Sequence, residues 1–161
     1  MVTAYVALGA NLGDASAALV QAVAAIKNLP LTEVSKVSSI YKTGPLDSDA
    51  LSAPGDDYFN AVVELQTSLN APALLDGLQN IEQAAGRERP YRNAPRTLDL
   101  DLLRYGSASI DSARLTVPHP RMTQRAFVLV PLAEIAPGLV SKAQLQAVAH
   151  QAITRSGDLA S

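Results

Sequence analysis

The order in which two hydrophobic periods follow one another constrains the fold of this chain more than any other feature. Period-two alternation or short β-branched runs, both typical of strands, occupy residues 3–8, 32–41, 58–68 and 97–106. Apolar residues recur at helical spacing in two segments, one after the first of these runs and one after the third. The order strand, helix, strand, strand, helix, strand predicts an α+β, ferredoxin-like βαββαβ sandwich with an antiparallel sheet and both helices on one face.

Both predicted helices carry start and stop signals. Asp14 can cap the first helix, which presents an apolar stripe and ends before Pro30. Pro72 lies in the first turn of the second helix, and Gly86 marks its end. The residues expected to face the core are Leu19, Val23 and Ile26 in the first helix and Leu74, Leu78, Ile81 and Ala85 in the second.

The remaining segments add to this core pattern. Residues 43–57, with two prolines, two glycines and four aspartates, are expected to form a long surface loop. Residues 109–122 predict two short strand pieces, followed by a helix through Phe127 and Leu129 and a last helix from about 142 to 153. With both core helices on one face, we expect the other face of the sheet to be open to ligands.

Composition narrows the class of protein. A chain of 161 residues that is 48% hydrophobic is long enough for one domain with a real core, so residues 1–161 are expected to form a single domain. The net charge of −2 gives no overall attraction to nucleic acid or to anionic lipid. The chain has no cysteine, no basic leader and no apolar run of about 20 residues. We therefore expect a soluble cytoplasmic protein.

The segment RERPYRNAPRTLDLDLL, residues 87–103, concentrates charge in a chain of which only 17% is charged. Its four arginines precede two aspartates that share one side of a strand, about 6.6 Å apart at the backbone, close enough to bind a shared cation or a pair of metal ions. Arginine forks match phosphate oxygens, so this set suits a metal-bound polyphosphate. The alternatives are a solvated strand face and surface ion pairs, but Glu88 is the only acid among residues 87–98.

A second basic group lies in RLTVPHPRMTQR. It contains Arg114, His119, Arg121 and Arg125, which could be a solvated surface or could complete a nucleotide pocket with residues 87–101. The glycine-rich turn GANLGD at 9–14 is a weaker signal, because a tight turn also explains it. The chain has no P-loop motif.

Four stretches of this sequence resemble the 6-hydroxymethyl-7,8-dihydropterin pyrophosphokinase family of folate biosynthesis. They are GANLGD, DYFNAVVEL, GRERPYRNAPRTLDLDLL and LTVPHPRMTQRAFVLVPLAEIAP. The resemblance implies a ferredoxin-like enzyme that transfers the pyrophosphoryl group of ATP to the hydroxymethyl oxygen of the pterin and releases AMP. It also implies two Mg²⁺ ions held by Asp99 and Asp101.

The resemblance assigns roles to further residues by position. Arg87 and Arg96 would act on the phosphates during transfer, together with the two aspartates, and Glu82 would lie behind the phosphate site. The other ATP-binding residues would be Gln79, Arg89, Arg92, Leu102, Arg114, Thr116, His119 and Arg125. The pterin would be bound by Thr43, Leu46, Tyr58, Asn60 and Phe127, with Tyr58 and Phe127 as the two faces of an aromatic sandwich.

Two functions of another class stay open at this stage. Sheets of this topology can present a stacking surface to RNA, but this chain has two Phe, no Trp and a negative net charge. A nucleotide-binding module without turnover is the other alternative. The expected partners are therefore small molecules, ATP and the pterin, without nucleic acid or membrane, and the protein is expected to be a monomer.

Overall fold

The computed structural model describes residues 1–11, 15–43, 58–86 and 98–159. The strands are β1 (Val2–Ala10), β2 (Thr32–Val37), β3 (Ser39–Thr43), β4 (Tyr58–Thr67), β5 (Asp99–Tyr105), β6 (Ile110–Asp111), β7 (Thr116–Val117) and β8 (Thr154–Asp158). The α-helices are α1 (Ala15–Lys27), α2 (Ala71–Gly86), α3 (Ala126–Ile135) and α4 (Lys142–Ala147), with two 3₁₀ turns at Met122–Gln124 and Pro137–Leu139. Among the described residues, no helix is long and apolar enough to cross a membrane.

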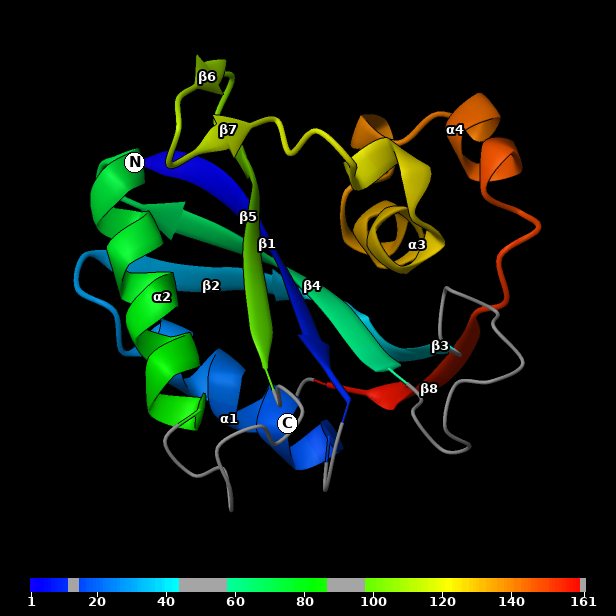
Figure 1. Ribbon diagram of the computed structural model, residues 1–161, viewed down its shortest axis with the longest axis horizontal. Coiled ribbons are helices and arrows are strands. Elements are labelled where there is room, and N and C mark those ends of the chain that lie inside the picture. Colours follow the sequence, from blue (N-terminus) through cyan, green and yellow to red (C-terminus); the bar gives the residue numbers. More distant parts are fainter. Residues whose placement is uncertain (12–14, 44–57, 87–97, 160–161) are drawn as a thin grey trace.

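The main sheet has the strand order β5-β1-β4-β3-β8, with β2 also paired to β4 (Figure 1). The pairings are antiparallel, and β1 lies between β4 and β5. The fourth, first, third and second strands of the predicted pattern are thus neighbours in that order, which is the ferredoxin-like arrangement. The predicted α+β fold class is confirmed. The two short strand pieces also form, as the β6–β7 hairpin.

Two hydrophobic cores share the sheet, one on each face. Alternate residues of β1, β4 and β5 pack with α1 and α2, including the predicted apolar stripes of both helices. The residues between them pack against α3 and the 3₁₀ turn before it; they are Tyr5, Ala7, Val62 and Leu103. Figure 1 shows α1 and α2 on one side of the sheet and α3 on the other. The expectation of an open second face was therefore wrong over the part that α3 covers, because α3 is itself strongly apolar and buries that surface.

The second predicted strand is broken into β2 and β3 at Ser38. The Ser38 side chain accepts a hydrogen bond from the Val62 backbone N–H (2.9 Å), and the Ser38 N–H donates to the Val62 carbonyl (3.0 Å). A side chain thus replaces one backbone group in the ladder, and both halves stay paired to β4. This explains the imperfect alternation of hydrophobicity around Val37.

The C-terminal segment also differs from the prediction. The last helix ends at Ala147 and not near Ile153, and residues 154–158 form β8, which extends the sheet beyond β3. Ser141 starts this helix with a capping box to Gln144. Strand β8 has the sequence TRSGD, which lacks apolar alternation and has Thr154 as its single β-branched residue, so it carries little of the usual sequence signal of a strand.

Candidate functional site

Strand β5 places two carboxylates at one edge of the sheet. Leu98, Leu100 and Leu102 are buried against α2, so alternation directs Asp99 and Asp101 to the opposite face. Because β5 pairs only with β1 in the main sheet, its outer side is not covered by another described strand. Asp99 is half-buried and Asp101 is exposed, so both acids are accessible beside the core.

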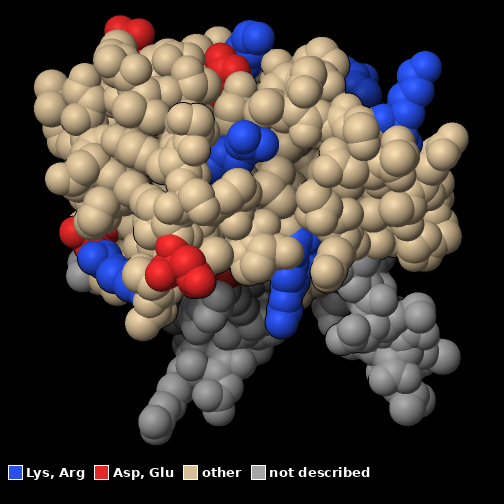
Figure 2. Space-filling model, turned by 90° about the horizontal axis from the view of Figure 1, so that it is seen from above, with Lys and Arg blue, Asp and Glu red and all other residues tan. Residues whose placement is uncertain are grey.

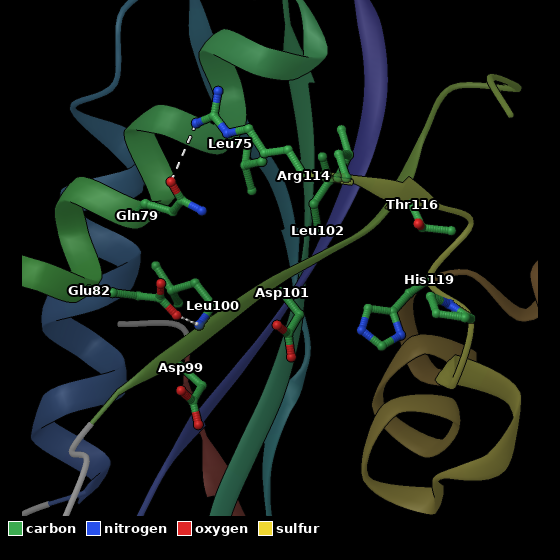
Figure 3. A pocket seen from close by; sticks show the side chains of 12 residues that line it. Leu75, Gln79, Glu82, Asp99, Leu100, Asp101, Leu102, Arg114, Thr116 and His119 are labelled. Atoms are coloured by element: carbon green, nitrogen blue, oxygen red, sulfur yellow. Dashed lines mark hydrogen bonds between the residues drawn. The ribbon is translucent and has the colours of Figure 1, made fainter. Parts of the chain in front are cut away.

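A cavity of about 410 Å³ surrounds this strand edge (Figure 3). It lies between α2, β5 and the segment that runs through β7 to the turn before α3. Its walls combine acidic, basic and apolar side chains. The described lining residues are Leu75, Gln79, Glu82, Asp99, Leu100, Asp101, Leu102, Arg114, Leu115, Thr116, His119 and Pro120.

Glu82 fixes the position of β5 relative to α2. Its Oε2 atom accepts a hydrogen bond of 2.7 Å from the backbone N–H of Leu100, the residue between the two aspartates. The backbone donor of an edge strand is thereby paired, and the strand segment that carries both acids is tied to the helix behind it. Glu82 thus lies beside the strand segment between Asp99 and Asp101, and its expected place behind a phosphate site stays a prediction.

Arg114 closes one end of the cavity. Its guanidinium forms an ion pair with Asp76 of α2 and donates a hydrogen bond of 3.3 Å to Oε1 of Gln79, one turn further along the helix. Both partners of the ion pair are about half exposed, with side-chain exposures of 49% and 60%. The cation is therefore held at the cavity mouth but stays accessible to an anionic ligand.

His119 lies opposite Asp101, and Figure 3 shows its ring turned toward that carboxylate. Its backbone N–H donates to the Leu103 carbonyl (2.8 Å), and its Nδ1 atom accepts from the Arg121 backbone N–H (3.1 Å). In the neutral ring the proton is therefore on Nε2. Desolvation lowers the pKa of His119 and the neighbouring Arg125 and Arg121 act in the same direction, while Asp101 opposes them.

A row of side chains crosses the sheet from Asp99 to β3. Gly9 of β1 is paired with Asp99 on one side and with Asn60 on the other, and Asn60 is paired with Tyr41. Directly paired residues point to the same face, so Asp99 and Asn60 share the face on which α3 packs. At Gly9 an added Cβ would be 3.1 Å from Asn60 Oδ1. Because Gly9 has no side chain, β1 leaves the surface of the sheet uncovered between Asp99 and Asn60.

Thr43 and Tyr58 complete this end of the sheet. They are paired across β3 and β4, and Asn60 Nδ2 donates a hydrogen bond of 3.2 Å to Thr43 Oγ1. Asn60 and Thr43 are buried, whereas Tyr58 keeps 38% of its surface exposed. The two polar groups are fixed at the base, and the aromatic ring lies at the rim.

Phe127 is in the first turn of α3 and is only partly buried. The guanidinium carbon of Arg125 lies over its ring, 5.4 Å from the centroid. One face of Phe127 thus has a cationic neighbour. Arg125 is not among the described residues that line the cavity, so the structure places it beside Phe127 and not beside Arg114.

Seven of the predicted site residues meet in the cavity, and five others lie along the sheet end, in α3 or just before it. In the cavity are Gln79, Asp99, Asp101, Leu102, Arg114, Thr116 and His119; outside it are Thr43, Tyr58, Asn60, Arg125 and Phe127. The remaining predicted residues, Leu46, Arg87, Arg89, Arg92 and Arg96, fall outside the described residues.

The donor set fits a hard divalent cation in part. Two carboxylates at i and i+2 of one strand offer oxygen ligands of the kind that Mg²⁺ prefers, and Mg²⁺ keeps several waters or phosphate oxygens besides one or two carboxylates. Within the part of the chain that the structure describes, no group of three or more His, Cys, Asp or Glu residues could hold a metal ion by itself. The two acids therefore suit an ion that a ligand also coordinates.

Sequence reasoning did not find Leu75, Leu100 and Leu115 as parts of the cavity wall. Leu75 is one turn before Gln79 on α2, so helical spacing from a predicted polar residue could have identified it. Leu115 lies between two predicted residues but points to the core side as well. The role of Gly9 depends on cross-strand register, for which the sequence has no direct signal.

Comparison of the sequence with known families gives one consistent result. Residues 5–137 match the model of the family described as 7,8-dihydro-6-hydroxymethylpterin-pyrophosphokinase. A Bacillus subtilis protein named 2-amino-4-hydroxy-6-hydroxymethyldihydropteridine pyrophosphokinase is 47% identical over 132 residues, which cover 82% of this chain and 77% of the relative. A Haemophilus influenzae protein of the same name is 48% identical, over 87% of this chain and 85% of the relative.

The fold has solved counterparts. A crystal structure described as HPPK-DHPS in complex with substrates matches 84% of this chain with a TM-score of 0.66 and 14% identity. The wild-type HPPK-DHPS of Plasmodium falciparum matches with a TM-score of 0.61 and 13% identity. This chain spans 40% of the length of each of these solved chains, and at this identity the similarity concerns the fold.

Proposed function

The chain belongs to the 7,8-dihydro-6-hydroxymethylpterin-pyrophosphokinase family, and from this premise we propose how its site performs pyrophosphoryl transfer in folate biosynthesis. The donor is ATP, the acceptor is the hydroxymethyl oxygen of 6-hydroxymethyl-7,8-dihydropterin, and the products are AMP and the pterin diphosphate. The observation that carries the proposal is the meeting of Asp99 and Asp101 with Gln79, Arg114 and His119 in one cavity at the sheet edge.

Asp99 and Asp101 would hold Mg²⁺, with two ions as the expected number. When bound, the metal neutralises phosphate charge and lowers the pKa of a coordinated hydroxyl. The hydrogen bond from Leu100 to Glu82 supports this role, since it holds the strand between the two acids in place. The proton of the attacking hydroxyl has to leave during transfer, and Asp99 or Asp101 would accept it.

The cavity wall would bind the nucleotide. Arg114 is a cation whose present partners, Asp76 and Gln79, are exposed enough to be exchanged for an anionic group. His119 would donate from Nε2, because its Nδ1 already accepts from the Arg121 backbone. Leu102, Thr116 and Arg125 would add further contacts, and Arg87, Arg89, Arg92 and Arg96 would supply positive charge for the phosphates, as phosphoryl transfer requires.

The sheet end would bind the pterin next to the acids. Asn60 and Thr43 form a polar pair joined by a hydrogen bond, and Gly9, which has no side chain, lies between Asn60 and Asp99. A flat heterocycle lying here would have its polar edge at Asn60 and aromatic neighbours in Phe127 and Tyr58, with Leu46 contributing from the segment after β3. The acceptor hydroxyl would then lie on the side of the metal-binding acids.

An AMP-release assay tests substrate, cofactor and reaction together. With ATP, Mg²⁺ and 6-hydroxymethyl-7,8-dihydropterin, we expect one AMP for each pterin diphosphate formed. Omitting the pterin should stop AMP release, and EDTA should abolish it until excess Mg²⁺ is added. ATP binding without AMP release in the complete mixture would instead identify a nucleotide sensor.

The surface does not favour the RNA-binding alternative. Among the described residues on the face in Figure 2, Lys and Arg side chains are spread over the surface and interspersed with Asp and Glu instead of forming one basic track. We further propose that residues 1–161 act as a single domain, as a monomer in the cytoplasm, without nucleic acid or membrane partners. Size-exclusion chromatography with light scattering would test the oligomeric state.

A further inference from the structure

Helix α3 carries an aromatic and an acidic side chain on the same side of the helix. Phe127 is in its first turn and Glu134 in its last, seven residues apart. Seven residues make almost two turns, so both side chains leave the helix in nearly the same direction, about 10 Å apart along the axis. Contacts that hold the side chain of Glu134 in one direction therefore also set the rotation of α3 about its axis, and with it the direction of the Phe127 side chain.

Glu134 is bound to β3 by four hydrogen bonds. Its carboxylate accepts from the Ser39 N–H (3.0 and 3.1 Å to the two oxygens), from the Ser39 hydroxyl (2.9 Å) and from the Tyr41 hydroxyl (2.7 Å). Arg155 of β8 donates to the same Ser39 hydroxyl (2.8 Å). Desolvation acts to raise the pKa of Glu134, but the hydrogen bonds from Tyr41 and Ser39 outweigh it and lower the pKa, so the ionised acceptor persists at neutral pH.

The strand side of this contact leads to the pterin region. Ser39, Tyr41 and Thr43 alternate on one face of β3, and Tyr41 is the cross-strand partner of Asn60, which itself donates to Thr43. Strand β3 thus presents its Glu134-binding groups and its Thr43 hydroxyl on the same surface. The junction between Glu134, Ser39 and Tyr41 connects the element that bears Phe127 with the strands that bear Thr43 and Asn60.

The first turn of α3 needs an external support. Pro131 has no N–H, so the carbonyl of Phe127 lacks its helical hydrogen bond. The residue before the helix, Arg125, provides no side-chain cap. Instead, Gln151 accepts from the Ala126 N–H (2.9 Å) and donates to the Gln124 carbonyl (2.9 Å). Helix α3 is therefore held at its first turn, which carries Phe127, by Gln151, and at its last turn by Glu134.

We propose that Glu134 is a positioning residue for pterin recognition, which acts by fixing the rotation of α3 against β3 so that Phe127 stands opposite Asn60 and Thr43. The inference rests on the proposed function, because it assigns a role in binding of the acceptor substrate. Glu134 has no part in the nucleotide cavity, whose described walls are α2, β5 and the segment from Arg114 to Pro120. Replacing Glu134 should therefore weaken the binding of the pterin and leave the binding of ATP almost unchanged.

The experiment compares full-length wild type with Glu134→Gln, Glu134→Ala and Tyr41→Phe in the AMP-release assay, with each substrate varied in turn. We expect the KM for the pterin to rise about tenfold in Glu134→Ala, less in the other two, and the KM for ATP to stay within about twofold. The size follows from the up to about 10²-fold loss that a displacement near 1 Å can cause. Gln151→Ala, which releases the other end of the turn, should act in the same direction.

Glu64→Gln is the matched control. Glu64 also accepts from a tyrosine and a serine, Tyr5 (2.6 Å) and Ser35 (2.8 Å), but these contacts stay within the sheet. Glu64→Gln and Glu134→Gln should both lower the Tm, and only Glu134→Gln should raise the pterin KM. Equal pterin KM values in Glu134→Ala and wild type, or an equal rise in Glu64→Gln, would overturn the inference alone. A wild type that releases no AMP would overturn the proposed function and the inference with it.

Discussion

Asp99 and Asp101 occupy the position at which single residues matter most for the proposed chemistry. Their leucine neighbours are buried, while they themselves face the cavity, so the acids contribute to the site and not to the core. Period-two alternation predicted this division, because a half-buried strand separates its two faces residue by residue. The partners of these acids across the cavity, such as His119, come from distant segments, and the residues alone left open whether that basic group is a solvated surface or part of the pocket.

Removing either acid should abolish turnover and leave the fold intact. We expect Asp99→Ala and Asp101→Ala each to reduce kcat in the AMP-release assay by roughly 10² to 10³-fold or more, as for other groups that stabilise transition-state charge. The circular dichroism spectrum and Tm should stay close to wild type. Glu33→Gln, which changes an exposed acid on β2, should keep full activity. Near-normal turnover of either alanine variant would contradict the proposed metal site.

Gly9 should be sensitive to the smallest possible enlargement. In Gly9→Ala the new Cβ would be 3.1 Å from Asn60 Oδ1, a tight contact that requires the amide to shift by a few tenths of an ångström. Because Asn60 is also bonded to Thr43, the shift should disturb the polar pair proposed to read the pterin. We expect the pterin KM to rise with little change in the KM for ATP. Gly138→Ala, in an open position, is the control, and an unchanged pterin KM in Gly9→Ala would show that Asn60 accommodates the methyl group.

At the scale of elements, the hydrophobic period located most of the strands and helices correctly, and the errors have particular causes. The Ser38 side chain enters the ladder and splits one predicted strand in two. The polar strand β8 forms because it can pair with the edge of β3 and because its Arg155 donates a hydrogen bond to Ser39. Both partners lie in another segment, so the sequence of β8 itself does not reveal them. Helix α3 was predicted, but its packing against the sheet was not, since hydrophobicity alone does not specify which surface a helix covers.

Two tyrosine–glutamate pairs lie on the face of the sheet that α3 covers, and they should make the free energy of unfolding decrease at alkaline pH. Burial and the hydrogen bond to Glu64 raise the pKa of Tyr5 to about 12, and burial and the hydrogen bond to Glu134 raise the pKa of Tyr41 to about 12. An unfolded tyrosine titrates near 10, so the neutral phenols stabilise the fold fully below about pH 10 and lose this contribution as the pH rises toward 12.

Urea unfolding at pH 8 and at pH 11 measures this contribution. The free energy of unfolding should fall between the two values, and the fall should be smaller in the double variant Tyr5→Phe/Tyr41→Phe than in wild type. Tyr58→Phe, which removes an exposed phenol, serves as the comparison for the effect of losing any tyrosine. The same pH dependence in all three proteins would rule out the two pairs as its source.

At the scale of the whole molecule, the C-terminal segment closes the sheet on the side opposite β5. Strand β8 covers the outer edge of β3, and Arg155 reaches the hydroxyl of Ser39, which also donates to Glu134. The match to the family model ends at residue 137, before this strand. Strand β5, which lines the cavity proposed to bind the nucleotide, lies at the opposite edge of the sheet from β8 (Figure 1).

Ending the chain after Ile153 should therefore affect stability more than nucleotide binding. We expect the Tm to fall, by about 2–4 °C for each kcal/mol of lost stability in a chain of this size, and the KM for ATP to be retained. Arg155→Ala in the full-length chain separates the side-chain contact from the strand and should give a smaller decrease. A truncated protein with the Tm of wild type would show that β8 adds nothing to the stability of β3.

The two cores described above share a sheet but no side chain, because each strand gives alternate residues to each. Residues of the core beneath α1 and α2 that do not line the cavity should therefore tolerate exchange for others of similar volume with little effect on substrate recognition. A combinatorial library that randomises Leu19, Val23, Leu74 and Leu78 with other aliphatic residues should yield variants that differ widely in thermostability and hardly in substrate affinity.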